Sequence, residues 1–213
     1  CTRSLVGSEM CIRDSDVPWW SSESLWRKTA IWVTAFMAVV LILLTFDTVR
    51  QITAGGERVP AFSVINQKIF YEYDDERGYQ VPRIGEEAAL FGEALDETNA
   101  EALVTLGKLT VQSKNCMNCH TLLGNGAYFA PDLTKAWLDP GWVHEDLREE
   151  MIVQFLLDPE GNARTFGTGR RMPNLGITEE EARGIVAFLK WMSSIDTNGF
   201  PRGFTPLDQE GGA

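Results

Sequence analysis

The five residues Cys116-Met117-Asn118-Cys119-His120 constrain this chain more than any other stretch. Two thiols three positions apart, followed directly by a histidine, form the signature of covalent c-type haem attachment. The spacing brings each sulfur to a haem vinyl group, and the next side chain comes beneath the iron as an axial ligand. The motif therefore predicts one covalent haem c, bonded to Cys116 and Cys119 and ligated by His120.

Two other interpretations of these cysteines fit the chain less well. A thioredoxin-like redox pair would not need His120 and would lie between a strand and a helix, for which the flanking sequence gives little support. A structural zinc site would need a second pair of ligands, but the other cysteines, Cys1 and Cys11, stand among the first dozen residues. Haem attachment is therefore the favoured interpretation.

The composition limits the class of partner. The chain has 213 residues, enough for one modest domain with appendages, and a formal net charge of −11. This acidic balance argues against a nucleic-acid partner and is compatible with a soluble, basic protein as the partner. Residues 1–15 have no apolar period and no anchor, so we expect a non-native or disordered leader there.

Residues 29–46 form an uncharged apolar run of eighteen residues. As a helix they would span roughly 27 Å, close to a hydrocarbon core of about 30 Å. Clustered tryptophans and Arg27-Lys28 precede the run, as at a cytoplasmic membrane interface. A cleaved signal peptide is the alternative, but its apolar region is usually shorter, about 7–15 residues. We expect residues 16–28 in the cytoplasm and an uncleaved transmembrane helix over residues 29–49.

The orientation follows from two independent arguments. The positive flank places the N-terminus inside, and haem attachment is expected outside, in a bacterial periplasm. The chain should thus cross the inner membrane once, with a periplasmic linker over residues 50–85. Within this linker Ile69, Tyr71 and Tyr73 alternate with polar residues, as in a short strand.

Helical patterns surround the haem motif. One apolar stripe predicts a helix from about Asn99 to Ser113, where Gly107 indicates close packing of another backbone or ring. A second helix is expected over residues 142–157, and Thr178 with Glu181 predicts a capping box for the last. With the haem motif among them, these helices resemble class I cytochromes c. The resemblance implies an all-α domain of that kind over residues 86–200, and we expect a tail over residues 201–213.

The sixth iron ligand decides between electron transfer and gas chemistry. Met172 stands in a Gly- and Arg-flanked loop before Pro173, 52 residues after His120, and is the favoured ligand. His144 is a minor alternative. Arg170 and Arg171 would then stand beside the haem edge, as partners of the propionates or as solvated charges. The other methionines lie in the leader, the apolar run, the attachment loop or helix faces with core spacing, and are Met10, Met37, Met117, Met151 and Met192.

The loop after the motif resembles small helical cytochromes c, in which a Pro-x-Leu follows the histidine by about eleven to thirteen residues. Pro131 and Leu133 match that placement. The resemblance implies that the Pro131 carbonyl accepts the His120 Nδ1 proton and that Leu133 covers one haem face.

A more specific resemblance extends over residues 25–201. The run Cys-x-x-Cys-His-Thr-Leu-Leu-Gly-x-Gly-Ala-Tyr-Phe-Ala-Pro-x-Leu at residues 116–133 is similar to the cytochrome c subunit of bacterial nitric oxide reductase. Residues 171–175, 188–191 and 195–199 are similar to it as well. The stretch over residues 51–100 is longer than the usual linker of that family.

This resemblance implies an electron-transfer subunit without an NO-reducing site of its own. A soluble periplasmic cytochrome c or cupredoxin would reduce the haem, and a large multi-helix haem b/b3 subunit would reduce NO in denitrification. The family also implies a calcium ion at the subunit boundary, held through Gly126 and Tyr128, although Gly126 could simply serve the turn and Tyr128 the haem wall.

Three alternatives remain at this point. They are a cytochrome subunit of a haem–copper oxidase, a free-standing membrane-anchored electron shuttle, and a haem enzyme or gas sensor with an open axial position. The run over residues 121–133 argues against the oxidase subunit.

Overall fold

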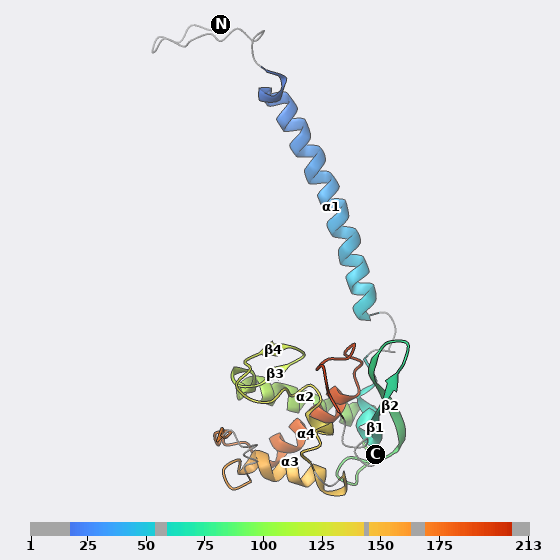
Figure 1. Ribbon diagram of the computed structural model, residues 1–213, viewed down its shortest axis with the longest axis vertical. Helices are drawn as coiled ribbons and strands as arrows, with labels where there is room; N and C mark the ends of the chain where they lie inside the picture. Colours follow the sequence, from blue (N-terminus) through green and yellow to red (C-terminus); the bar gives the residue numbers. More distant parts are fainter. Residues whose placement is uncertain (1–17, 54–58, 143–144, 163–168, 206–213) are drawn as a thin grey trace. The chain divides into compact units, whose positions relative to one another are not determined.

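The computed structural model describes residues 18–53, 59–142, 145–162 and 169–205. The chain divides into two compact units, Cys1–Gly55 and Gly56–Ala213. Among the described residues, the first unit contains one long helix, and the second contains the other α-helices and the strands (Figure 1).

Helix α1, Glu23–Thr53, is the long helix of the first unit. Its segment Glu23–Arg50 is apolar and long enough to cross a membrane, and its large side chains are exposed, Trp32 by 76%. The hydroxyls of Thr45 and Thr48 donate to backbone carbonyls one turn earlier, at 2.7 and 2.8 Å. A helix with internally satisfied donors and an apolar surface suits lipid. The structure therefore contains the predicted candidate transmembrane helix.

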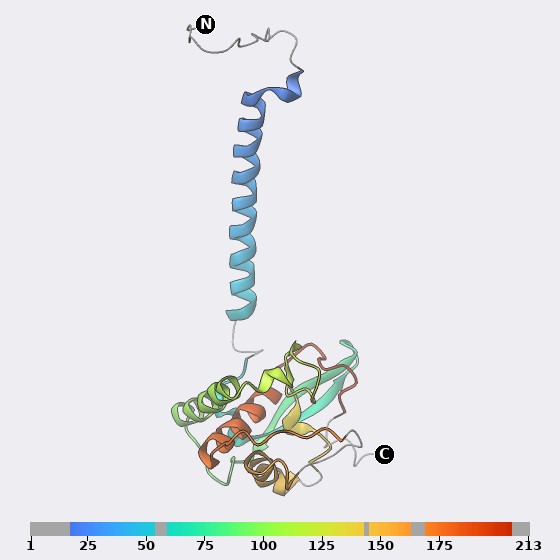
Figure 2. The same ribbon diagram turned by 90° about the vertical axis from the view of Figure 1, so that its left-hand side faces the viewer.

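In the described residues, the second unit is built from helices, two antiparallel hairpins and short 3-10 turns, and α2 and α4 lie against each other (Figures 1 and 2). In chain order its elements are η3 (Phe62–Asn66), β1 (Gln67–Asp74), β2 (Tyr79–Glu87), α2 (Glu97–Ser113), η4 (Cys116–Asn118), β3 (Thr121–Leu122), β4 (Asn125–Gly126), η5 (Ala136–Leu138), η6 (Glu145–Leu147), α3 (Arg148–Leu157) and α4 (Glu179–Ser193).

The crossing of α2 and α4 depends on two glycines. A Cβ atom on Gly107 would lie 1.9 Å from the carbonyl oxygen of Gly184, and one on Gly184 would lie 2.9 Å from the Gly107 nitrogen. The two backbones therefore touch, which confirms the close packing predicted at Gly107. Helix α4 begins at the capping box predicted from Thr178 and Glu181, which the structure also confirms.

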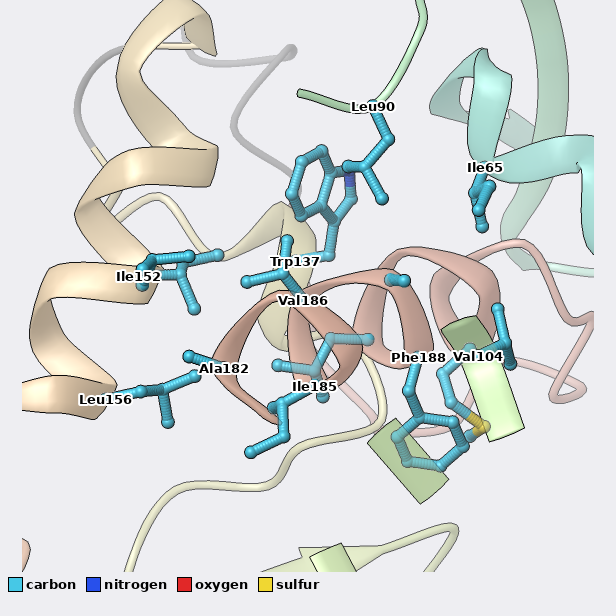
Figure 3. Packing of buried hydrophobic residues seen from close by; sticks show 14 of the residues in the cluster. Ile65, Leu90, Val104, Trp137, Ile152, Leu156, Ala182, Ile185, Val186 and Phe188 are labelled. Atoms are coloured by element: carbon cyan, nitrogen blue, oxygen red, sulfur yellow. The ribbon is translucent and has the colours of Figure 1, made fainter. Parts of the chain in front are cut away.

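The core lies around α4, most of whose side chains are buried. Figure 3 shows Ile152 and Leu156 of α3 directed toward Ala182 on one side of α4, while Val104 of α2 lies beside Phe188 on another. Helix α4 is thus covered by α2 and α3. Burying these aliphatic and aromatic side chains is the main favourable contribution to folding.

The prediction of an all-α fold is wrong in part, because β1 and β2 form an antiparallel hairpin. The alternation of Ile69 and Tyr71 marked β1 correctly, and both side chains are buried. Strand β2 was hidden because Pro82 and Gly85 are typical of turns. In a two-stranded sheet each strand is an edge, so a proline that donates no hydrogen bond is tolerated at the position opposite Tyr71.

The hairpin is fastened to the end of α4 and the segment after it. The Tyr71 hydroxyl donates to the Ser193 carbonyl at 2.7 Å. Near the hairpin tip, Arg77 pairs with Asp196 at 2.7 Å and donates to the Asn198 side chain at 3.1 Å. The hairpin is therefore part of the folded unit and not a loose spacer.

A buried lysine, Lys135, also contacts both the hairpin and the segment at the end of α4. Lys135 is 3% exposed, and its Nζ donates to the carbonyls of Ile195 at 2.8 Å and Ser193 at 3.4 Å. The ammonium also lies 4.7 Å from the centre of the Tyr71 ring. Burial lowers the pKa of Lys135 to about 8, although the charges of Asp196 and Asp132 oppose that shift.

The lysine predicts an unusual pH dependence of stability. Between pH 8 and 10 the unfolded chain binds more protons at this site than the folded chain, so the free energy of unfolding should rise with pH, by about 2 kcal/mol. Burial also raises the pKa of Tyr71, which should make stability fall again above about pH 10. Urea unfolding of the full chain in detergent would measure this rise.

Lys135→Met should remove the rise, and Lys108→Met, on the exposed face of α2, should leave it unchanged. An equal rise in wild type and Lys135→Met would contradict the prediction.

Candidate haem site

The attachment motif lies in a tight turn directly after α2. Asn115 adopts the left-handed region with φ 54°, which ends the helix and turns the chain into η4. The backbone nitrogens of Cys119 and His120 donate to the Cys116 carbonyl at 3.1 and 2.9 Å. Both cysteines are half-buried, and burial raises the pKa of the Cys116 thiol. The local fold thus places two thiols and a histidine within one turn.

These residues line one hollow of about 450 Å³, a volume typical of cofactor pockets. The structure brings together Cys116, Cys119 and His120 from the motif and Met172 from 52 residues further along the chain. The full lining is Lys114, Asn115, Cys116, Cys119, His120, Tyr128, Phe129, Ala130, Pro131, Asp132, Leu133, Ala136, Asp139, Trp142, Phe155, Arg170, Arg171, Met172, Pro173 and Leu175.

The hollow has the chemistry that a c-type haem requires. Its walls are mainly apolar, and Arg170 and Arg171 supply cationic groups at exposed positions. Two thiols are available for the thioether bonds, and imidazole and thioether side chains are available for the iron. The residues present therefore fit a haem.

His120 is held in one orientation by the loop that follows it. Its Nδ1 lies 2.7 Å from the carbonyl oxygen of Pro131, which is the expected contact. With the proton on Nδ1, the ring donates to this carbonyl and leaves Nε2 free to bind a metal.

Asp132 supports this arrangement, and sequence reasoning did not single it out. Its carboxylate accepts from the Thr121 hydroxyl at 2.6 Å and from the Thr134 nitrogen at 2.8 Å. The Leu133 nitrogen donates to the Thr121 carbonyl at 2.8 Å. This network fixes the segment after Pro131 to the chain that follows His120. The only indication in the sequence was a polar residue inside the Pro-x-Leu pattern.

Gly126 has a structural requirement of its own. Its φ is 116°, and a Cβ there would lie 2.2 Å from the His120 carbonyl oxygen. The loop can therefore fold back against the haem motif only with glycine at this position. Tyr128 lines the hollow but is 80% exposed. Within the described residues, no group of three or more His, Cys, Asp or Glu side chains is arranged to hold a metal ion.

The remaining predicted residues have the following positions. Met172 and Leu133 are half-buried and line the hollow, whereas Arg171 is exposed at it. His144, the alternative ligand, lies outside the described residues. The sequence did not indicate that Trp142 and Phe155 line the hollow. The centres of their rings lie 6.3 Å apart in an edge-to-face arrangement. Their apolar character predicted packing, but not against which surface.

Comparison with known proteins identifies the unit. The family model for cytochrome c matches residues 104–193. The C subunit of nitric oxide reductase from Stutzerimonas stutzeri is 38% identical over 113 residues, which are 52% of this chain and 73% of that protein. The same protein of Paracoccus denitrificans is 36% identical over 114 residues, or 51% and 71%.

The corresponding protein of Cereibacter sphaeroides is 38% identical over 101 residues, or 46% of this chain and 65% of that protein. A cytochrome c unit with its thiols, histidine and methionine around one hollow, together with these relatives, leads to one assignment: the chain belongs to the family of cytochromes c that form the C subunits of nitric oxide reductases.

Proposed function

We propose that the chain is the electron-entry subunit of a nitric oxide reductase. It takes electrons from a soluble periplasmic cytochrome c or cupredoxin and delivers them to a large multi-helix haem b/b3 subunit. There, two NO molecules, two electrons and two protons give N2O and water. The observation that carries this proposal is the single hollow lined by both thiols, His120 and Met172.

The chain's own residues determine what the site does. Haem c, when bound, supplies one-electron redox chemistry. His120 and Met172 would ligate the iron, and Cys116 and Cys119 would hold the haem covalently. The Pro131 carbonyl would keep the proton on His120 Nδ1, and Leu133 and the other apolar walls would shield the bound haem from water. With an imidazole and a thioether both available to ligate the iron, the site would suit electron transfer and not NO binding.

The topology and calcium site remain part of this proposal. We place residues 16–28 in the cytoplasm, residues 29–49 in the inner membrane, and the linker and cytochrome domain in the periplasm. The apolar surface of α1 supports the membrane span. Arg27-Lys28 at its N-terminal side and the attachment of haem outside the cytoplasm support this orientation. The Gly126 carbonyl and Tyr128 would contribute oxygen ligands to a calcium ion shared with the partner subunit, which suits the exposure of Tyr128.

Purification through a tag on this chain tests the proposal. A large haem b protein should co-purify, and rapid mixing with a reduced cytochrome c donor should reduce haem c before haem b. A Cys116→Ala/Cys119→Ala chain should abolish NO reduction driven by that donor. It should preserve NO reduction driven by a small chemical reductant of the partner's haems.

The outcomes distinguish the alternatives. A free-standing shuttle would purify without a partner. An oxidase subunit would purify with a complex that consumes O2 and not NO. Either result would contradict the proposed function.

A further inference from the structure

Arg170 connects the loop that carries Met172 to the loop that contacts His120 through Pro131. It stands two residues before Met172 and contacts Phe129, which stands two residues before Pro131. Its Nη1 donates to the Phe129 carbonyl at 2.7 Å, and its guanidinium carbon lies 4.8 Å from the centre of the Phe129 ring. One side chain therefore makes both a charged hydrogen bond and a cation–π contact to the same residue.

The Met172 loop needs such a contact because it has no regular structure of its own. Residues 169–178 form neither helix nor strand, and Gly169 and Gly176 have φ of 67° and 61°. Beyond the methionine, the Lys114 ammonium donates to the Gly176 carbonyl at 3.0 Å. Met172 thus lies between two hydrogen bonds that connect its loop to the segments on either side of the haem motif. Arg170 donates to Phe129, and Gly176 accepts from Lys114.

We propose that Arg170 is a positioning residue, a latch that holds the Met172 loop against the His120 side of the pocket and keeps the thioether at the iron. This inference rests on the proposed axial pair. The planar guanidinium can stack on the Phe129 ring while its edge donates to the carbonyl, whereas a lysine could not do both. Arg170 is exposed, so the latch can open without disturbing the core.

The matched control is Arg183 on α4. Its guanidinium carbon lies 4.6 Å from the centre of the Phe91 ring, and its Nη2 pairs with Glu179 at 3.0 Å. It has the same type of aromatic contact as Arg170, but it does not line the hollow. Arg183→Ala therefore removes a comparable surface interaction without touching the Met172 loop.

The experiment measures carbon monoxide binding to the reduced full-length chain in detergent, together with its reduction potential. Arg170→Ala should increase the rate of CO binding about tenfold over wild type, because loss of the latch increases the fraction of open loop, and should lower the potential. Arg170→Lys should have a CO binding rate and a reduction potential between those of wild type and Arg170→Ala. Arg183→Ala should behave as wild type.

Two further variants keep the test decisive. Phe129→Leu removes the ring and keeps the carbonyl, and should give a smaller increase than Arg170→Ala. Met172→Ala defines the fully open site. If Arg170→Ala binds CO no faster than wild type while Met172→Ala does, the latch is wrong and the axial pair stands. If wild type binds CO as fast as Met172→Ala, the axial pair itself is wrong. An equal increase in Arg183→Ala would also overturn the latch.

Discussion

Valine in place of Gly107 is expected to prevent stable folding of the cytochrome unit. A Cβ at this position would lie 1.9 Å from the Gly184 oxygen and 2.8 Å from the Ile185 nitrogen. Both are backbone atoms of α4 and cannot rotate away, so α2 and α4 would have to separate. Overpacked cores lose about 1–3 kcal/mol when side chains can adjust. We expect a larger loss here, a substantial part of a total stability of about 5–15 kcal/mol.

Thermal unfolding of the full chain in detergent, followed by tryptophan fluorescence, would measure this loss. Lys108→Val is the matched control, because it places the same side chain on the exposed face of α2 at the next position. It should cost only the helix propensity of valine, about 0.5 kcal/mol. The stability of Gly107→Ala should lie between those of Gly107→Val and Lys108→Val. A Gly107→Val protein as stable as Lys108→Val would show that the helices do not meet through this glycine.

Loss of the Met172 thioether is expected to change the electronic properties of the haem more than any other single substitution outside the attachment motif. Met172→Ala should open one axial position, allow the reduced haem to bind CO, and lower the reduction potential on the order of 0.1 V. Thioether ligation favours the reduced state, so its loss favours the oxidised state. Absorption spectra in both redox states and a potentiometric titration would measure these changes.

The control is Met151→Ala, because Met151 is half-buried on α3 and does not line the hollow. It should keep the wild-type spectrum and potential. An unchanged low-spin spectrum in Met172→Ala would contradict the assignment. If His144→Ala opened the site instead, the ligand would be the second histidine.

The sequence predicted well the features determined by neighbouring residues. The capping box of α4 depends on side chains three positions apart. The haem motif lies within five residues. The His120–Pro131 contact, which the resemblance to small helical cytochromes c implied, closes a loop of only eleven. Gly107 was predictable as well, because a glycine inside an amphipathic helix is costly unless another group approaches closely.

The features that remained hidden depend on contacts between distant segments. Strand β2 carries Pro82 and Gly85, and its strand conformation depends on its partner β1. Lys135 is buried against backbone carbonyls about 60 residues further along the chain. Every residue has a backbone carbonyl, so the sequence does not indicate which ones accept a hydrogen bond from a given lysine. Arg170 likewise meets Phe129 across 41 positions. A charged residue in a sequence is expected to be solvated until its three-dimensional neighbours are known.

The way the hairpin is fastened has a consequence for any truncated, soluble version of this protein. A fragment that began at residue 86 would contain the haem motif and helices α2, α3 and α4. It would nevertheless lack Tyr71, leaving the Ser193 carbonyl without that donor and removing the aromatic ring beside the Lys135 ammonium. It would also lose Pro60, whose carbonyl accepts from the Trp191 indole at 3.2 Å. The shortest fragment worth expressing therefore starts before Pro60, so that about a quarter of its length precedes the first helix.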